Sequence, residues 1–275
     1  MAGNRRQHLL HLLGLGLTGW GGTAWAQTTS PLDHGYAAWD ALLKKHVHWL
    51  ADGKQSRVNY KGFAADRAEL KKVLAEWSGV TAAQFAGFTR AQQMAFLINA
   101  YNGFTVELIL GQYPALKSIK DLGNVWQSPW KKKFFTLLGE ERHLDWIEHE
   151  QLRPRYADPR VHAAVNCASI GCPALRPEAF TATRLEAQLD DGLLRFMADR
   201  TRNRYANGKA EISAIFKWFK EDFEQGHQGL RKIEDLLARY ADQLAETPAE
   251  RGKLKSGIVP ISYLDYDWSL NDTHP

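Results

Sequence analysis

The sequence predicts an α+β fold, a mostly helical single domain with a small sheet. Three observations support this prediction. Most apolar residues recur at intervals of three or four, the spacing of an amphipathic helix, and only short segments have the features of strands. No internal repeat or long polar linker divides the 275 residues. The hydrophobic content of 44% and the charged content of 24% are typical of a chain that buries a core.

Residues 1–26 are predicted to be a signal peptide. Arg5 and Arg6 precede an apolar stretch, and Ala24 and Ala26 form a small-x-small cleavage site. The paired arginines also resemble a twin-arginine signal. The alternative is a retained membrane anchor, but the apolar stretch contains glycines and is shorter than the roughly 20 residues of a span. We therefore expect cleavage, no transmembrane span afterwards, and a periplasmic or secreted mature protein.

The mature chain is expected to consist of an N-terminal leader and helix over residues 27–52 and one globular domain over residues 53–271. The formal net charge is +4, and it falls to +2 when the two signal-peptide arginines are removed. A charge this small gives no reason to expect a nucleic-acid partner.

Helical patterns dominate the first part of the mature chain. Apolar residues at helical spacing predict helices over 36–50 and 63–77, with a short extended segment at 57–60 between them. Gly53 ends the first of these helices.

The strongest helical pattern begins after Thr89. Thr89 and Gln92 have the arrangement of a capping box, and Gly111 ends the pattern. Asn99 and Asn102 lie three residues apart within this apolar stretch, so they belong to neighbouring turns of one helix face. Amides in an apolar stripe require hydrogen-bond partners, which makes both residues candidates for a positioning role.

A shorter helix is predicted from Asp145 to about Arg153. Asp145 is the expected N-cap, and Glu148 then lies in the first turn, where its charge suits the helix dipole. A strand is predicted over 160–168, and both cysteines lie at or after its end. Later elements follow from local signals: a capping box at Thr183 and Glu186, a hairpin turn at Asn207–Gly208, helices from Ser213 and over 230–244, and a final strand over 257–267.

The densest cluster of reactive side chains surrounds these cysteines, and the first interpretation is a cysteine nucleophile. A thiolate needs a nearby base, and the base needs an orienting partner. His149 lies near a helix N-terminus, whose field keeps the ring neutral. His162 is five residues before Cys167, and odd offsets on a strand point to opposite faces, so His149 is the preferred base. Asn99 or Asn102 would orient the histidine or donate to an oxyanion.

Three further residues are candidates for substrate binding. Arg153 either holds a substrate carboxylate through two parallel bonds or pairs with Asp158. His162 and Tyr101 are the other two candidates.

Two alternatives remain for the cysteines. Cys167 and Cys172 are five residues apart in an expected oxidising compartment, so they can form a disulfide, which silences a nucleophile unless the bond is a redox switch. Together with His149 and His162 they also form a permissible zinc set, but their spacing matches no common finger. We therefore predict no metal and no cofactor.

Several separated motifs resemble the signature of the domain-of-unknown-function 547 family. They occur in the same order and spacing and span roughly residues 53–271. The segments that carry the resemblance are Phe96–Asn102, Ile147–His149, Leu152–Arg153, Asp158–His162, Asn166–Ala168, Gly171–Leu175, Phe216–Phe219 and Tyr266–Asn271.

The resemblance implies an exported bacterial protein whose fold is related to permuted papain-like or transglutaminase-like cysteine hydrolases. It then implies that Cys167 is the nucleophile and His149 the base. His would precede Cys in the chain, the reverse of papain's order, which is acceptable because geometry defines such a site.

These observations lead to a principal hypothesis and two alternatives. The first is an exported cysteine-dependent hydrolase or acyl transferase that acts on amide or thiol-containing peptides. The second is a non-enzymatic envelope binding protein in which Cys167–Cys172 is a structural disulfide. A thiol–disulfide redox module is a third, although the chain lacks Cys-x-x-Cys. The expected partner is a small peptide or thiol-containing substrate; the oligomeric state is not predicted.

Overall fold

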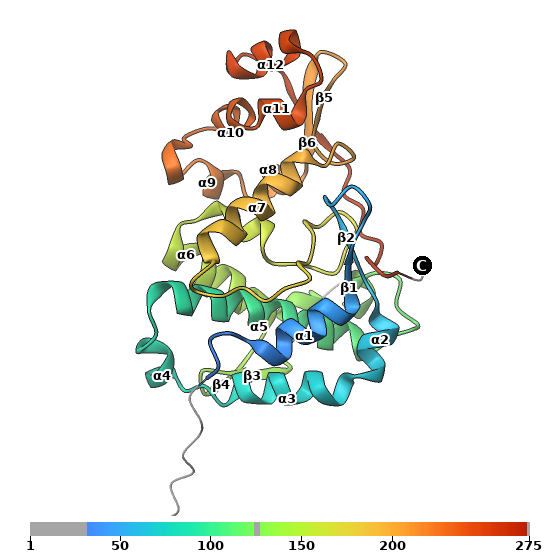
Figure 1. Cartoon of the computed structure of the whole chain (residues 1–275), viewed down its shortest axis with the longest axis vertical. Helices are drawn as coiled ribbons and strands as arrows, with labels where there is room; N and C mark the ends of the chain where they lie inside the picture. The colour runs from blue at the N-terminus through green and yellow to red at the C-terminus, as the bar shows by residue number, and fades with distance from the viewer. Residues whose placement is uncertain (1–31, 124–126, 274–275) are drawn as a thin grey trace, which may run out of the picture. The chain divides into compact units, whose positions relative to one another are not determined.

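The structure is a computed structural model that describes residues 32–123 and 127–273. Leu32–Pro275 form one compact unit. The predicted signal peptide lies outside the described residues and stays a prediction. Helices predominate among the described residues, and the strands form three small sheets (Figure 1), which confirms the predicted mostly helical α+β class.

The central element of the first core is α5 (Arg90–Leu110). Its capping box is present as predicted, with the Thr89 hydroxyl accepting from the Gln92 backbone, and Gly111 follows its last residue. Nearly every residue from Met94 onward is buried, as expected for a helix that is apolar on all sides. It packs against α2 (Tyr60–Ala65) and α3 (Arg67–Ser78).

The predicted helix over 36–50 is wrong at its C-terminal end. Helix α1 (Ala37–His46) stops at His46, and the next residues form β1 (Val47–Trp49), which pairs antiparallel with β2 (Ser56–Val58). Val47 lies opposite Val58, and both are buried. Cross-strand packing of two β-branched residues thus overrides the helical spacing.

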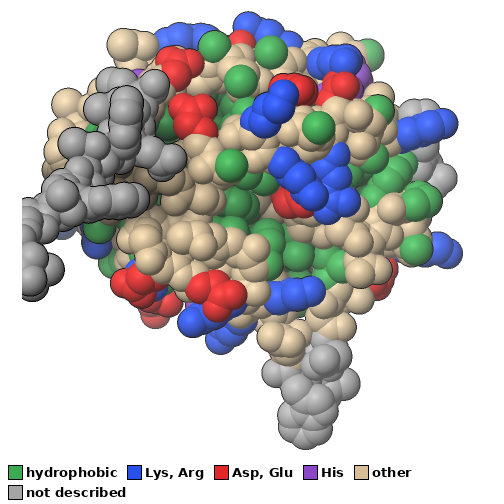
Figure 2. All heavy atoms as spheres, turned by 90° about the horizontal axis from the view of Figure 1, so that it is seen from below, with side chains coloured by type: hydrophobic (Ala, Val, Ile, Leu, Met, Phe, Trp, Pro, Cys, Tyr) green, Lys and Arg blue, Asp and Glu red, His purple; other side chains and the backbone are tan. Residues whose placement is uncertain are grey.

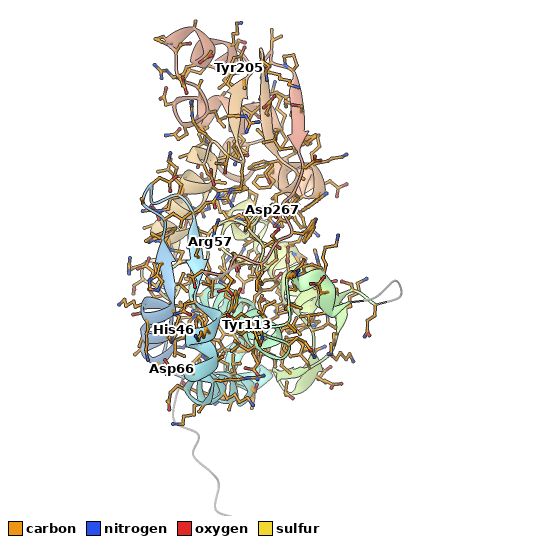
Figure 3. All side chains as sticks on the ribbon, turned by 90° about the vertical axis from the view of Figure 1, so that its right-hand side faces the viewer. His46, Arg57, Asp66, Tyr113, Tyr205 and Asp267 are labelled. Carbon is orange, nitrogen blue, oxygen red and sulfur yellow. A yellow bond between two sulfur atoms is a disulfide. The ribbon has the colours of Figure 1, made fainter. Side chains whose placement is uncertain are left out.

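The predicted helix over 63–77 is two helices, α2 and α3, with a break at Asp66. The Asp66 carboxylate lies 2.6 Å from Lys45 Nζ and 2.7 Å from His46 Nε2. Figure 3 shows His46 and Asp66 close together. The break therefore places a carboxylate where it joins α1 to the start of α3.

A second group of buried residues surrounds the sheet β5–β6–β7, where β6 pairs antiparallel with β5 and parallel with β7. The hairpin at Asn207–Gly208 is confirmed, and both residues have positive φ, as a type I′ turn requires. The elements of this region are β5 (Arg204–Ala206), β6 (Lys209–Ser213), α8 (Ile215–Trp218), α9 (Lys220–Phe223), η5 (His227–Gly229), α10 (Ile233–Arg239), α11 (Ala241–Leu244), α12 (Pro248–Lys255) and β7 (Ile261–Leu264).

Two predictions in this half are wrong in extent. The helix over 230–244 is interrupted at Tyr240, and the final strand covers only the four residues that pair with β6. Helix α12 was not predicted, although Thr247 and Glu250 give it a capping box.

The predicted strand over 160–168 is also wrong. Residues Pro159–Ala163 form a 3₁₀ helix, η4, because the Asp158 carboxylate accepts from the Arg160 backbone and Pro159 fits the first helical position. The predicted capping box at Thr183 is absent from α7 (Leu185–Ala198); Glu186 accepts instead from Arg160.

The remaining elements are short helices and a hairpin, and their buried apolar residues belong to the first core. They are α4 (Ala82–Ala86), η1 (Ile119–Leu122), η2 (Pro129–Lys131), β3 (Phe135–Leu137), β4 (Glu140–Arg142), η3 (Trp146–Leu152) and α6 (Arg153–Tyr156).

The surface shown in Figure 2 carries interspersed basic and acidic side chains with apolar ones between them, so this face has no broad area of one charge. Within residues 32–123 and 127–273, no helix combines the length and the apolar character that a membrane span requires.

Candidate functional site

A cavity of about 210 Å³ lies where the two cores meet. It brings together five residues that the sequence singled out: Tyr101, His149, His162, Cys167 and Cys172. Tyr101 comes from α5, His149 from η3 and His162 from η4, while the cysteines lie on the loop that follows. Segments separated by many residues therefore converge on one pair of sulfur atoms.

Aromatic side chains form much of the cavity wall. Trp218 and Trp268 are stacked with ring centroids 5.7 Å apart, and Tyr266 lies 4.5 Å from Trp268. Phe219 stacks on the His162 ring at 3.9 Å. Because Trp218 is 47% exposed, the aromatic wall extends from the cavity to the surface.

The two cysteines are joined in a disulfide, with Cα atoms 6.3 Å apart, as the disulfide alternative predicts. Cys167 is partly exposed, whereas Cys172 is buried. The Tyr266 hydroxyl lies 3.1 Å from Cys167 Sγ and, since a disulfide sulfur has no proton, the hydroxyl is the donor. In this oxidised state the protein has no free cysteine thiol.

Buried asparagines hold the loop that carries the cysteines. Asn102 donates to the Ala164 carbonyl at 3.0 Å and accepts from the Asn166 backbone at 2.8 Å. The Asn166 side chain donates to the Pro173 carbonyl at 2.8 Å and accepts from the Ala168 backbone at 2.9 Å. Asn102 thus fixes the backbone just before Cys167.

Asn99 is placed elsewhere. Its amide donates to the Phe180 carbonyl at 2.8 Å and accepts from the Phe180 backbone N–H at 3.0 Å. It does not line the cavity. The Asn99 side chain therefore holds the backbone at Phe180 against α5.

His149 lies on η3, a π-helical segment, a feature that is frequent at functional sites. The prediction that Asp145 caps this helix is wrong, because Asp145 has helical backbone angles and its side chain makes no cap hydrogen bond. His143 Nδ1 instead accepts from the Trp146 backbone at 3.0 Å. The Asp145 side chain is left to line the cavity.

The His149 ring is 36% exposed, and its neighbours favour one tautomer when the ring is neutral. Its Nδ1 lies 2.8 Å from Arg153 Nη1, and because a guanidinium only donates, this nitrogen is the acceptor in that tautomer. The ring proton is then on Nε2, which lies 3.7 Å from Asp145 Oδ1. Burial raises the pKa of Asp145, and the charge of His149 opposes this effect.

His162 is held between two carboxylates. Its Nε2 lies 2.7 Å from Asp222 Oδ2, and its Nδ1 lies 3.6 Å from Glu148 Oε1. Burial opposes protonation of His162, but these carboxylates outweigh it and raise its pKa. Burial likewise opposes ionisation of Glu148, but His162, His149 and the Tyr101 hydroxyl lower its pKa. Both nitrogens of His162 are therefore committed to carboxylates.

Arg153 pairs with Asp222, and the predicted alternative pairing with Asp158 is wrong. Its Nε and Nη2 donate to the two Asp222 oxygens at 2.6 and 3.1 Å, whereas Asp158 pairs with Arg160. The two parallel bonds that would hold a substrate carboxylate are thus formed within the protein.

Sequence reasoning missed Asp222, Tyr266 and Asn166 as site residues, and also Asn271, which donates to the Asn166 side chain at 3.2 Å. Tyr266 and Asn271 belong to a motif that carried the family resemblance, which was the available signal. Asp222 follows the Phe216–Phe219 motif by three residues, and no sequence motif includes it.

The zinc alternative requires two thiolates, but the structure joins both sulfurs in a disulfide. Among the described residues, no group of three or more His, Cys, Asp or Glu side chains is arranged to hold a metal ion.

Replacing Asp222 with asparagine should make stability less dependent on pH. Burial opposes ionisation of Asp222, but His162 and Arg153 lower its pKa to about 2. The lowered pKa of Asp222 contributes about 2 kcal/mol to the free energy of unfolding. This contribution is present above pH 4 and is lost as the pH falls toward 2. The raised pKa of His162 adds stability that is complete below about pH 6.5 and is lost as the pH rises through the raised pKa.

Urea unfolding of the wild type and Asp222→Asn at pH 2.5, 5.5 and 8.5 checks this expectation. The difference in unfolding free energy should be largest at pH 5.5. Asp242→Asn, at a mostly exposed carboxylate, is the matched control and should show little difference at any pH. A difference for Asp222→Asn that does not change between pH 2.5 and 5.5 contradicts the prediction.

Comparisons with known proteins give one match. Residues 85–197 match the family described as "Protein of unknown function, DUF547". No curated protein and no solved structure matches the chain. The matched segment includes α5, η3, η4 and both cysteines, so most residues around the disulfide lie within it. Residues 85–197 are therefore similar to the DUF547 family.

Proposed function

We propose that the mature chain is an exported thiol-dependent enzyme, a hydrolase or acyl transferase that acts on amide or thiol-containing peptides. One observation carries the proposal: the partly exposed Cys167 lines the same cavity as His149 and the buried Glu148. An apolar cavity with a few convergent titratable groups, some with shifted pKa values, is typical of active sites. Export rests on the composition of residues 1–26.

The nucleophile has to be released before it can react. A dithiol reductant would supply two electrons, convert the Cys167–Cys172 disulfide to two thiols and itself become a disulfide. Cys167 would then be the reactive sulfur because it is the more exposed of the pair. The hydroxyls of Tyr266 and Ser169, at 3.1 and 3.5 Å from its sulfur, would donate to a thiolate.

His149 is the proposed base. To take the Cys167 proton on Nε2, the ring must carry its own proton on Nδ1, so Arg153 Nη1 must first leave that atom. Arg153 keeps its two bonds to Asp222 in this step. The sulfur then attacks the substrate carbonyl carbon, the bond to the leaving amine or thiol breaks, and His149 returns the proton to it. Water or another acceptor releases the acyl group from Cys167.

The second candidate is an envelope binding protein in which the disulfide is structural. The disulfide and the aromatic wall favour it, because Trp218 and Trp268 present stacked faces beside the cavity. In this case the cavity holds a ligand without any thiol step.

Alkylation of the reduced protein distinguishes the two candidates. The mature protein is reduced with dithiothreitol, exposed briefly to iodoacetamide and analysed by peptide mass spectrometry. Under the enzyme proposal, Cys167 should react at least about tenfold faster than Cys172 at pH 7, since a stabilised and accessible thiolate reacts fastest.

His149→Gln should slow labelling at Cys167 and leave labelling at Cys172 unchanged. Equal rates at the two sulfurs, or a disulfide that dithiothreitol cannot open in the folded protein, would reject the enzyme proposal and favour the binding protein.

A further inference from the structure

A second and larger cavity, of about 640 Å³, adjoins the disulfide loop. Ile170 and Gly171 line it, whereas Cys167 and Cys172 line the first cavity. Tyr266 lines both. The proposed thiol chemistry assigns no role to this second space, although its volume suits a small organic ligand.

A buried guanidinium with an unused donor lies in the wall of this cavity. The Arg202 side chain is only 9% exposed. Its Nε donates to Asp199 at 2.7 Å and its Nη1 donates to the Cys172 carbonyl. Its Nη2 has no hydrogen-bond partner among the described residues. A buried donor without a partner is unfavourable, so an anionic acceptor at this position would be stabilising.

A second guanidinium faces the same space. Arg57, on β2, is half-buried and donates to Gln55 Oε1 at 3.1 Å and to the Ser56 carbonyl at 3.2 Å. Burial is the main cause that lowers the pKa of Arg202; Asp199 opposes it, and the positive charge of Arg57 lowers it further. The two cations therefore repel each other, and a carboxylate between them would relieve the repulsion.

Exposed carboxylates lie at the rim of the same cavity. Asp52, Asp265 and Asp267 all line it. Figure 3 shows Arg57 and Asp267 on the face turned toward the viewer. The inner wall of the cavity thus holds two guanidinium groups and the Asp199 carboxylate that pairs with Arg202, and its rim is anionic and exposed.

We propose that this cavity binds a short peptide with free ends. The peptide carboxylate contacts Arg202 and Arg57, and its ammonium group faces the rim carboxylates. A purely anionic ligand would be repelled by the rim, and a purely cationic one would leave the Arg202 Nη2 donor unused. The inference is independent of the proposed enzyme, because it involves neither sulfur nor His149.

Calorimetry on the oxidised mature protein tests the proposal, with trialanine as the probe. Trialanine should bind, and its C-terminal amide and its N-acetyl form should each bind at least about tenfold more weakly, since each loses one charged contact. The first cavity has no free thiol under these conditions, so failure here does not affect the enzyme proposal.

Two variants test the contacts of the peptide carboxylate and of its ammonium group separately. Arg57→Gln should weaken the binding of trialanine at least about fivefold and should not change the already weak binding of its C-terminal amide. Asp265→Asn should weaken the binding of trialanine but not that of its N-acetyl form. Arg239→Gln, an exposed arginine away from the cavity, is the matched control and should bind like the wild type. No binding at peptide concentrations on the order of 10 mM, or equal binding of trialanine and its amide, overturns the proposal.

Discussion

Replacing Cys172 with serine should make the protein active without a reductant, whereas replacing Cys167 with serine should abolish turnover. Cys172→Ser leaves Cys167 as a permanent thiol in the cavity with His149 and Tyr266. Cys167→Ser removes the nucleophile, and its kcat/KM should fall by at least about 1,000-fold relative to Cys172→Ser. Hydrolysis of a peptide and thioester panel, with and without dithiothreitol, measures the difference.

The two variants are matched controls because each loses the same disulfide. Closing a loop of six residues contributes about 2 kcal/mol by chain entropy, so both variants should lose a similar amount of stability. Any difference in turnover then comes from the sulfur that remains. If the two variants are equally inactive and equally able to bind a ligand, the disulfide is only structural and the enzyme proposal is wrong.

Elements with strong local signals could be predicted from the sequence. Helix α5 begins at its capping box and ends at Gly111 because hydrogen bonds within a few residues determine both ends. The Asn207–Gly208 hairpin is likewise a local conformation of two residues that accept positive φ.

The segment before Cys167 has conflicting local signals, because Asp158 and Pro159 favour a helical turn there. Its alternating apolar residues resemble a strand, but Arg160 bonds Asp158, Glu186 and Asp190, and two of these partners lie 26 and 30 residues away. Such contacts exist only in the folded chain, and they accompany a 3₁₀ helix in this segment. The prediction that His162 and Cys167 point to opposite faces of a strand therefore had no structural basis. Both nitrogens of His162 nevertheless face carboxylates.

The lining of the first cavity was predictable to a similar degree. Cys167, His149, His162 and Tyr101 were chosen from residue type or motif, and they line one cavity. The residues that orient them were not predictable, because Asp222 lies 60 residues from His162 and Tyr266 lies 99 residues from Cys167. Pairing over these distances depends on how the two cores pack.

Truncating Asn166 to alanine should lower the free energy of unfolding far more than the truncation of an exposed amide side chain. The Asn166 side-chain oxygen accepts from Ala168 and from Asn271 Nδ2, at 2.9 and 3.2 Å, and its amide donates to Pro173 at 2.8 Å. All of these bonds are buried. The variant leaves three polar groups without partners, at about 1–3 kcal/mol each. Losses above about 5 kcal/mol are exceptional for one substitution, so we expect the lower part of this sum, about 3–5 kcal/mol.

Urea unfolding of the oxidised protein at pH 7 measures this loss. Gln112→Ala, the truncation of an exposed amide side chain, should change stability by less than about 0.5 kcal/mol. Because Asn166 also joins the two ends of the cysteine loop, Asn166→Ala should remove the difference in alkylation rate between Cys167 and Cys172 after reduction. A loss below about 1 kcal/mol would mean that water or a shifted backbone replaces the missing bonds, and the loop would then owe its position to the disulfide alone.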